Sequence, residues 1–156
     1  MAVRLVTVSD DVYIRALEQL LQAFPEGRVS LWFDNRPEPY TYYFEVKPRN
    51  ARSASIRGMI ERDGDIEITI GSVTTALESN RSYNDPKQVE QFKQICAAVI
   101  AGKYEEQVYS VDKVRLGVVG IVHLPTMDRK FKTIDRLSLK WLSSRKRVEK
   151  VTFDPY

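Results

Sequence analysis

Apolar side chains recur every three or four residues near the start of the chain, with polar residues between them. The members of this stripe are Ile14, Leu17, Leu21 and Phe24. Such spacing predicts an amphipathic helix that lies on a sheet. Ser9 or Asp10 is the expected N-cap, because either side chain can accept a hydrogen bond from the first turn. The segment Pro25-Glu26-Gly27 is expected to stop the helix.

A second helix is expected to begin at Asp85-Pro86, where an N-cap residue precedes a proline in the first helical position. Its apolar stripe consists of Val89, Phe92, Cys96 and Val99. Gly102 supplies the stop signal. Because Cys96 lies inside this stripe, we predict a small buried apolar residue and not a reactive thiol.

Between these two helices the period changes from helical spacing to strict alternation, which predicts strands. Residues 29–34 alternate in this way, and so do residues 40–47 beyond a loop that Pro37 and Pro39 stiffen. Phe33 and Phe44 fall on the apolar face of these strands. Trp32 and Tyr43 therefore share the opposite face.

Residues 54–72 are expected to form a hairpin whose register follows from its turn. A three-residue loop at 62–64, with Gly64 in the left-handed conformation of a G1 bulge, places apolar residues opposite one another. The predicted pairs are Ile60 with Ile66, Gly58 with Ile68 and Ile56 with Ile70. A tight two-residue turn would instead set isoleucines opposite glutamates and lose that burial.

The last third of the chain predicts further strands. Residues 73–83 are polar and are expected to be irregular. Strands are expected at 104–111 and 114–124, joined by a turn at Asp112-Lys113, and the second of them is apolar on both faces, as in a central strand. Residues 129–142 fit a strand or a helix, and residues 151–153 fit a closing strand.

Together these patterns predict the α+β class, with a largely antiparallel sheet of about six to eight strands packed against two amphipathic helices, in the order α-β-β-β-β-α-β-β-β. We expect one domain, residues 1–156, because this length suits a single core and the sequence contains no repeat or linker.

Composition places the chain among ordinary soluble proteins, with 43% hydrophobic and 29% charged residues. The single cysteine excludes an internal disulfide and favours a reducing compartment. The apolar run at the N-terminus is too short for a signal peptide, and none elsewhere approaches the roughly 20 residues that cross a bilayer. We therefore expect a cytoplasmic protein with no membrane partner.

Charge is unevenly distributed, which raises a nucleic-acid alternative. Residues 129–150 carry nine basic and two acidic side chains, a net charge of +7 within a chain of net charge +3, so the remainder carries −4. The residues that would contact phosphates are Arg129, Lys132, Lys140, Arg145 and Arg147. This hypothesis requires them to line one contiguous surface, and no recognised nucleic-acid-binding motif supports it.

The sequence lacks the common signatures of catalysis, of phosphate binding and of metal binding. The chain contains one histidine, His123, which we interpret as a packed or edge residue with a single hydrogen bond. An enzyme or ligand-binding domain with a site near His123, or with Glu45 and Glu67 acting together, is a second alternative. We predict no catalytic residue, no metal and no cofactor.

The leading hypothesis is a non-enzymatic protein-binding module, a class that includes inhibitor and immunity-type proteins. Its predicted contact residues are Trp32, Tyr43 and Arg36, because exposed aromatic rings beside an arginine on a stiff loop are the usual components of a binding hot spot. Burial of both rings beneath the second helix would remove this support. Self-association through a sheet edge is a further expectation.

Overall fold

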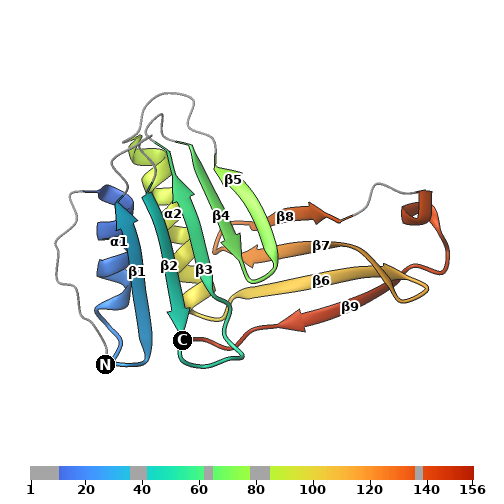
Figure 1. Ribbon diagram of the computed structural model, residues 1–156, viewed down its shortest axis with the longest axis horizontal. Coiled ribbons are helices and arrows are strands. Elements are labelled where there is room, and N and C mark those ends of the chain that lie inside the picture. Colours follow the sequence, from blue (N-terminus) through green and yellow to red (C-terminus); the bar gives the residue numbers. More distant parts are fainter. Residues whose placement is uncertain (1–10, 36–41, 62–64, 78–84, 136–138) are drawn as a thin grey trace.

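The computed structural model describes residues 11–35, 42–61, 65–77, 85–135 and 139–156. These residues form two α-helices, one 3-10 helix and nine strands, which confirms the α+β class and the antiparallel pairing. The strands belong to two sheets, one of five strands and one of four (Figure 1).

The first sheet is a meander in which each strand pairs with the next. Its strands are β1 (Val29–Asn35), β2 (Tyr42–Pro48), β3 (Ile56–Ile60), β4 (Ile66–Ile70) and β5 (Val73–Leu77). Strand β5 lies in the segment that we expected to be irregular, so that expectation was wrong. Val73 and Leu77 are buried against the core, while Thr75 lies between them on the same face and weakens the apolar pattern.

The predicted hairpin register is confirmed. Ile60 lies opposite Ile66, Gly58 opposite Ile68, and Ile56 opposite Ile70. A hydrogen bond of 2.8 Å from the Glu61 N–H to the Asp65 carbonyl oxygen closes the hairpin. The loop residues 62–64 lie outside the described part of the chain.

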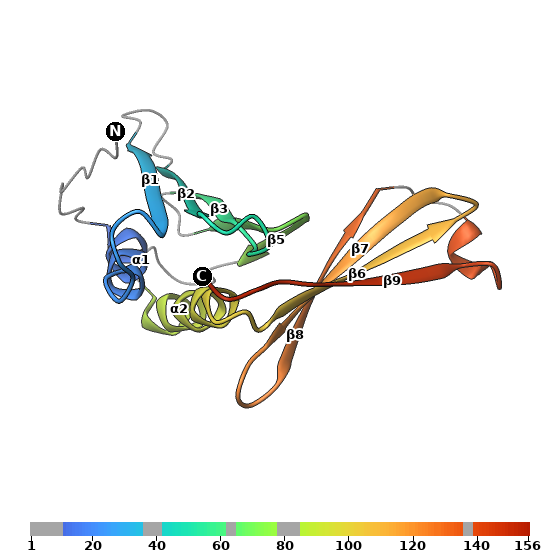
Figure 2. The same ribbon diagram turned by 90° about the horizontal axis from the view of Figure 1, so that it is seen from below.

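Two helices, α1 (Val12–Leu21) and α2 (Pro86–Ile100), lie on one side of the five-stranded sheet (Figure 2). The expected start of α2 is confirmed, since the Asp85 side chain accepts a hydrogen bond from the Lys87 N–H. The expected N-cap of α1 is wrong. Asp11 caps this helix, and its carboxylate accepts from the N–H groups of Tyr13 and Ile14. A run of three capping residues, at 9–11, offers the same signal at each position.

The core lies between these helices and the sheet. The Phe92 ring from α2 meets the Phe44 ring from β2 edge-on at 5.8 Å and the Tyr13 ring from α1 at 5.3 Å. The isoleucines of β3 and β4 complete this layer. Cys96 is fully buried, and burial raises the pKa of its thiol, which agrees with the apolar role predicted for it.

The second sheet has the order β8-β7-β6-β9 and extends away from the helices (Figure 1). We call it the arm, together with the short helix η1. Its elements are β6 (Tyr104–Val111), β7 (Val114–His123), β8 (Asp128–Ile134), η1 (Leu139–Leu142) and β9 (Arg147–Thr152). The central place predicted for β7 is confirmed. The ambiguous stretch 129–142 contains both kinds of structure, a strand and then a 3-10 turn.

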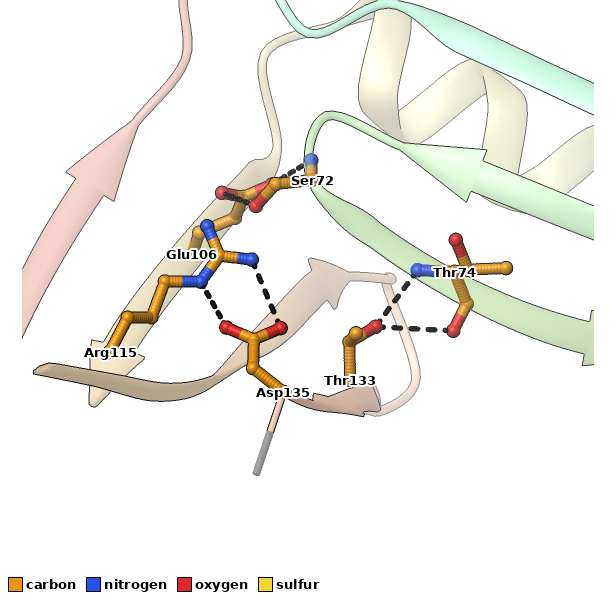
Figure 3. A network of polar contacts seen from close by, with 6 residues as sticks. All are labelled: Ser72, Thr74, Glu106, Arg115, Thr133 and Asp135. Atoms are coloured by element: carbon orange, nitrogen blue, oxygen red, sulfur yellow. Dashed lines mark hydrogen bonds and ion pairs between the residues drawn. The ribbon is translucent and has the colours of Figure 1, made fainter. Parts of the chain in front are cut away.

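One end of the arm packs against the body of the protein, and its other end, where the β6–β7 turn and η1 lie, we call the distal end. Val118, Val122 and Phe131 point into the same core as the helices. Glu106 of β6 reaches the β4–β5 turn, where its two carboxylate oxygens accept from the Ser72 N–H at 2.7 Å and the Ser72 hydroxyl at 2.6 Å (Figure 3). The Thr74 N–H of β5 donates to the Thr133 hydroxyl of β8 at 3.0 Å.

Candidate functional site

The face of the five-stranded sheet that points away from the helices is the first candidate surface, and we call it the outer face. Strand register fixes which side chains it presents. One row consists of Trp32, Glu45, Arg57, Thr69 and Thr74. The adjacent row contains Asp34, Tyr43, Met59 and Glu67. Since Trp32 lies directly opposite Glu45, two residues along β2 from Tyr43, the two rings are diagonal neighbours.

Both predicted aromatic residues are accessible on this face. Trp32 is 54% exposed and Tyr43 is 38% exposed. Helix α2, which could have covered them, lies on the other side of the sheet, and within the described ranges the outer face has no helix across it (Figure 2). Arg36, the third residue of the predicted set, lies outside the described residues. The structure therefore brings together two of the three.

Acidic side chains surround the two rings. Asp34 lies opposite Tyr43, Glu45 lies opposite Trp32, and Glu67 follows on β4. Two basic residues lie among them: Arg57, in register with Glu45, and Lys47, the other diagonal neighbour of Trp32 on β2. The outer face therefore combines exposed aromatic area with more negative than positive charge near the rings.

The same geometry separates Glu45 from Glu67. Strand β3 runs between β2 and β4, so the two backbones are about 9–10 Å apart, twice the spacing of neighbouring strands. Arg57 lies opposite Glu45, and Met59 lies opposite Glu67. The two carboxylates do not form the hydrogen-bonded acid–base pair that the enzyme alternative requires.

His123, at the end of β7, contacts two carboxylates instead of making the single hydrogen bond that we expected. Its Nδ1 is 2.9 Å from Oδ1 of Asp128, and its Nε2 is 3.4 Å from Oε2 of Glu105. Lys150 from β9 also reaches that Glu105 oxygen at 2.6 Å. Asp128 is the residue paired with His123 on β8, so the β7–β8 register brings the first pair together.

These contacts favour the charged form of His123. The hydrogen bond with Asp128, and then that with Glu105, raise the pKa of the imidazole above its usual value. The hydrogen bond from Lys150, with a smaller contribution from His123, lowers the pKa of the Glu105 carboxyl. Because both ring nitrogens face carboxylates, neither is left to accept a proton from a substrate. The arrangement is that of an ion-pair cluster that ties four strands together, β6, β7, β8 and β9.

In the described part of the chain, the cluster around His123 included, no group of three or more His, Cys, Asp or Glu residues is arranged to hold a metal ion. None of the described helices is long and apolar enough to cross a membrane.

The predicted basic residues are divided between the two ends of the arm. Arg129 lies near the body, in register with Val122. Lys140, Arg145 and Arg147 lie at or near the distal end, on η1, on the turn after it and at the start of β9. Lys132 lies between them, and its Nζ is 4.3 Å from the centre of the Trp141 ring. Arg129 is therefore separated from Lys140, Arg145 and Arg147, while Lys132 reaches η1 through the Trp141 ring.

The distal end also presents two exposed leucines, around an inward-facing Trp141, that the sequence did not mark as a binding surface. Trp141 packs over Tyr109 with ring centres 5.6 Å apart, and Lys146 donates to the Trp141 carbonyl oxygen at 3.2 Å. Leu139 and Leu142, on either side of Trp141 and Lys140 in η1, are 85% and 84% exposed. Apolar residues at 137, 139, 141 and 142, followed by basic residues at 145–147, were the available signal, but spacing alone does not tell exposed leucines from buried ones.

Comparisons of the chain with protein-family models, with curated proteins and with solved structures found no match.

Proposed function

We propose that this protein is a non-enzymatic cytoplasmic binding module that holds a protein partner against the outer face of its five-stranded sheet. The observation that carries this proposal is the 54% exposure of Trp32 on a sheet face opposite the helices, with Tyr43 as its diagonal neighbour. Tryptophan and tyrosine are the residues that most often dominate the energy of a protein interface.

The rigid support beneath the rings favours tight binding. On the inner face of β2, Phe44 and Val46 are packed in the core, so the backbone that carries Tyr43 is fixed. Trp32 is held in register with Glu45 by the β1–β2 ladder. A surface that is already ordered loses little conformational entropy on binding, and the aromatic side chains contribute large contact areas with few rotatable bonds.

Charge defines the kind of partner. Three acids, Asp34, Glu45 and Glu67, lie among and beside the rings against two cations, Lys47 and Arg57, so the excess negative charge favours a partner that presents arginine or lysine side chains. A cation on the partner can pack over the Trp32 ring while it pairs with a neighbouring carboxylate. An inhibitor or immunity-type protein, which acts by covering a basic surface of another protein, is the class that fits.

The experiment compares three immobilised proteins in extracts of the cells that produce this chain. These are the wild type, the variant Trp32→Ala/Tyr43→Ser, and a control with Leu139→Ser/Leu142→Ser, in which exposed apolar residues are removed from the arm. A protein retained by the wild type and the control but not by the outer-face variant is then purified and titrated.

Fluorescence locates the contact. The chain has two tryptophans, so Trp141→Phe leaves Trp32 as the only indole. We expect binding of the purified partner to shift Trp32 emission to the blue, and Trp32→Ala to weaken affinity about tenfold or more, which corresponds to about 1.4 kcal/mol. The proposal is overturned if no protein depends on Trp32 and Tyr43, or if the partner leaves Trp32 emission unchanged.

A further inference from the structure

Exposed apolar side chains gather at the distal end of the arm. Of the seven large hydrophobic residues exposed among the described residues, Leu139 and Leu142 lie on η1 at this end, and Ile134 and Val148 lie on β8 and β9 nearer the body. Trp32 and Tyr43 belong to the outer face, and Met127 lies in the β7–β8 turn. Helix η1, which carries both leucines, lies far from the strands β1 and β2 that carry Trp32 and Tyr43 (Figure 1), and the function proposed above does not use it.

The geometry of η1 directs two leucines outward together. In a 3-10 helix with three residues per turn, positions i and i+3 lie on the same side, so Leu139 and Leu142 are aligned. Trp141 points the other way, onto Tyr109 and onto the backbone of Gly117, where a Cβ atom would come within 3.0 Å of the indole. Trp141 thus anchors the turn, and the leucines project from it with 85% and 84% of their surface exposed.

Basic side chains gather at the same end of the arm. A shallow hollow at the same end is lined by Lys113 from the β6–β7 turn and by Arg145, Lys146 and Arg147 from the segment that enters β9. Two acidic residues, Asp112 and Glu149, share its lining, so the cations outnumber the acids. Lys140 adds a further exposed cation within η1 itself.

We propose that the distal end of the arm binds the surface of a membrane that contains anionic phospholipids. Leu139 and Leu142 would enter the interfacial region, and Arg145, Arg147 and Lys113 would contact lipid phosphates. A bilayer presents phosphates at its surface and hydrocarbon directly beneath, so it can engage both the projecting leucines and the cations at the same end of the arm. A nucleic acid would use the cations but leave both leucines in water.

This proposal departs from our expectation of no membrane partner, which rested on the lack of a segment long enough to span a bilayer. Contact with the surface requires no such segment, only an apolar group that reaches the interface and cations that stay at the headgroups. It is independent of the binding function proposed for the outer face.

The test is sedimentation of the full-length protein with vesicles of phosphatidylcholine, with and without phosphatidylglycerol. We expect the wild type to bind the anionic vesicles and to bind neutral ones far more weakly. Leu139→Ser/Leu142→Ser and Arg145→Gln/Arg147→Gln should each weaken binding about tenfold or more, since each removes one of the two contributions. All four side chains are exposed, so circular dichroism should show unchanged folding.

The matched control is Trp32→Ala/Tyr43→Ser, which removes exposed aromatic rings from the other surface and should bind vesicles as the wild type does. Loss of binding in this control would overturn the assignment to the arm, while failure of the outer-face proposal would leave the vesicle result unchanged. The inference is also overturned if anionic vesicles do not bind the wild type. Equal binding by the leucine variant, together with leucine-independent binding of a single-stranded oligonucleotide, would assign the cations to a nucleic acid.

Discussion

Replacement of Glu106 tests whether this buried carboxylate fastens the arm to the body. Glu106 is 5% exposed, and its side chain crosses from β6 to the β4–β5 turn. Gly71 in that turn has φ +56°, and a Cβ at this position would collide with the Glu106 carboxylate (Figure 3 shows the adjoining Ser72 contact). The turn and the carboxylate are thus fitted to one another.

The cost of the substitution follows from the hydrogen bonds that Glu106 accepts. Two come from Ser72, at 2.7 Å from its N–H and 2.6 Å from its hydroxyl, and one comes from the Tyr104 hydroxyl at 3.0 Å. The Tyr104 hydroxyl also lies 3.0 Å from the Ile70 carbonyl oxygen, so it keeps a partner. The two Ser72 bonds are the net loss, and at about 1.5–3 kcal/mol for each bond to a charged acceptor they predict about 3–6 kcal/mol for Glu106→Ala.

Glu106→Gln removes the negative charge of this side chain but keeps its size and shape. The amide oxygen can still accept from the Ser72 N–H, and the amide nitrogen can donate to the Ser72 hydroxyl oxygen, so both contacts survive without their charge assistance. We expect a loss of about 1–2 kcal/mol. This variant also keeps the test informative if Glu106→Ala fails to fold, since a domain has only about 5–15 kcal/mol of stability in total.

Urea unfolding, followed by circular dichroism, measures these differences. Glu149→Gln is the matched control, because it makes the same change at an exposed acid on the neighbouring strand β9. The free energy of unfolding of this control should stay within about 0.5 kcal/mol of the wild-type value. Equal stability of Glu106→Gln and Glu149→Gln, or a loss below about 1 kcal/mol for Glu106→Ala, would refute the view that Glu106 joins the two sheets.

Three further predictions concern single residues. Gly58→Ala should destabilise the protein by about 1–3 kcal/mol in urea unfolding, because the new methyl group would lie 2.8 Å from the Phe44 ring and against the Glu67 carbonyl oxygen; a neutral effect would contradict this packing. His123 has a raised pKa in the folded state, so its stabilising effect is complete below pH 6.5, the usual pKa, and is lost as the pH rises through the raised value. The stability difference between the wild type and His123→Gln should therefore be larger at about pH 6 than at about pH 9, and a constant difference would argue against the ion pairs. Lys113→Gly should stabilise the protein by about 1 kcal/mol in thermal unfolding, because Lys113 has φ +64° and glycine adopts this conformation without strain; a lower melting temperature would be contrary to this reasoning.

Short-range sequence patterns predicted strand register and the start of a helix correctly where the turn residues and the spacing of apolar residues indicate the same structure. The Ile60–Ile66 pairing follows from a loop length that puts isoleucines on one face, and the start at Asp85 follows from the proline after it. The turn at Asp112-Lys113 is confirmed as well, with φ values of 51° and 64°. In each case the decisive contacts lie within a few residues along the chain, so spacing carries the information.

Long-range contacts were not predictable in this way. The division into two sheets depends on where β5 stops pairing and on the Glu106–Ser72 contact, which joins residues 34 positions apart. The second carboxylate at His123 comes from β6, and Trp141 is directed inward by the space above Gly117. An exposed Leu139 and a buried leucine have the same local pattern, because exposure depends on what the fold brings nearby.

The distribution of charge gives the length of the arm a physical role. Residues 1–102 carry 12 basic and 14 acidic side chains, whereas residues 103–156 carry 12 and seven, so the body is net negative and the arm is net positive. From Glu106 at the body to Lys113 at the turn, the strand runs about 23 Å, well beyond the screening length of about 8 Å at physiological salt. The acids of the outer face therefore neither repel an anionic membrane bound at the distal end nor compete for the cations there. A basic partner on the outer face is likewise beyond repulsion by Arg145 and Arg147. The Glu106–Ser72 contact at the base of the arm thus leaves the two proposed binding surfaces more than a screening length apart.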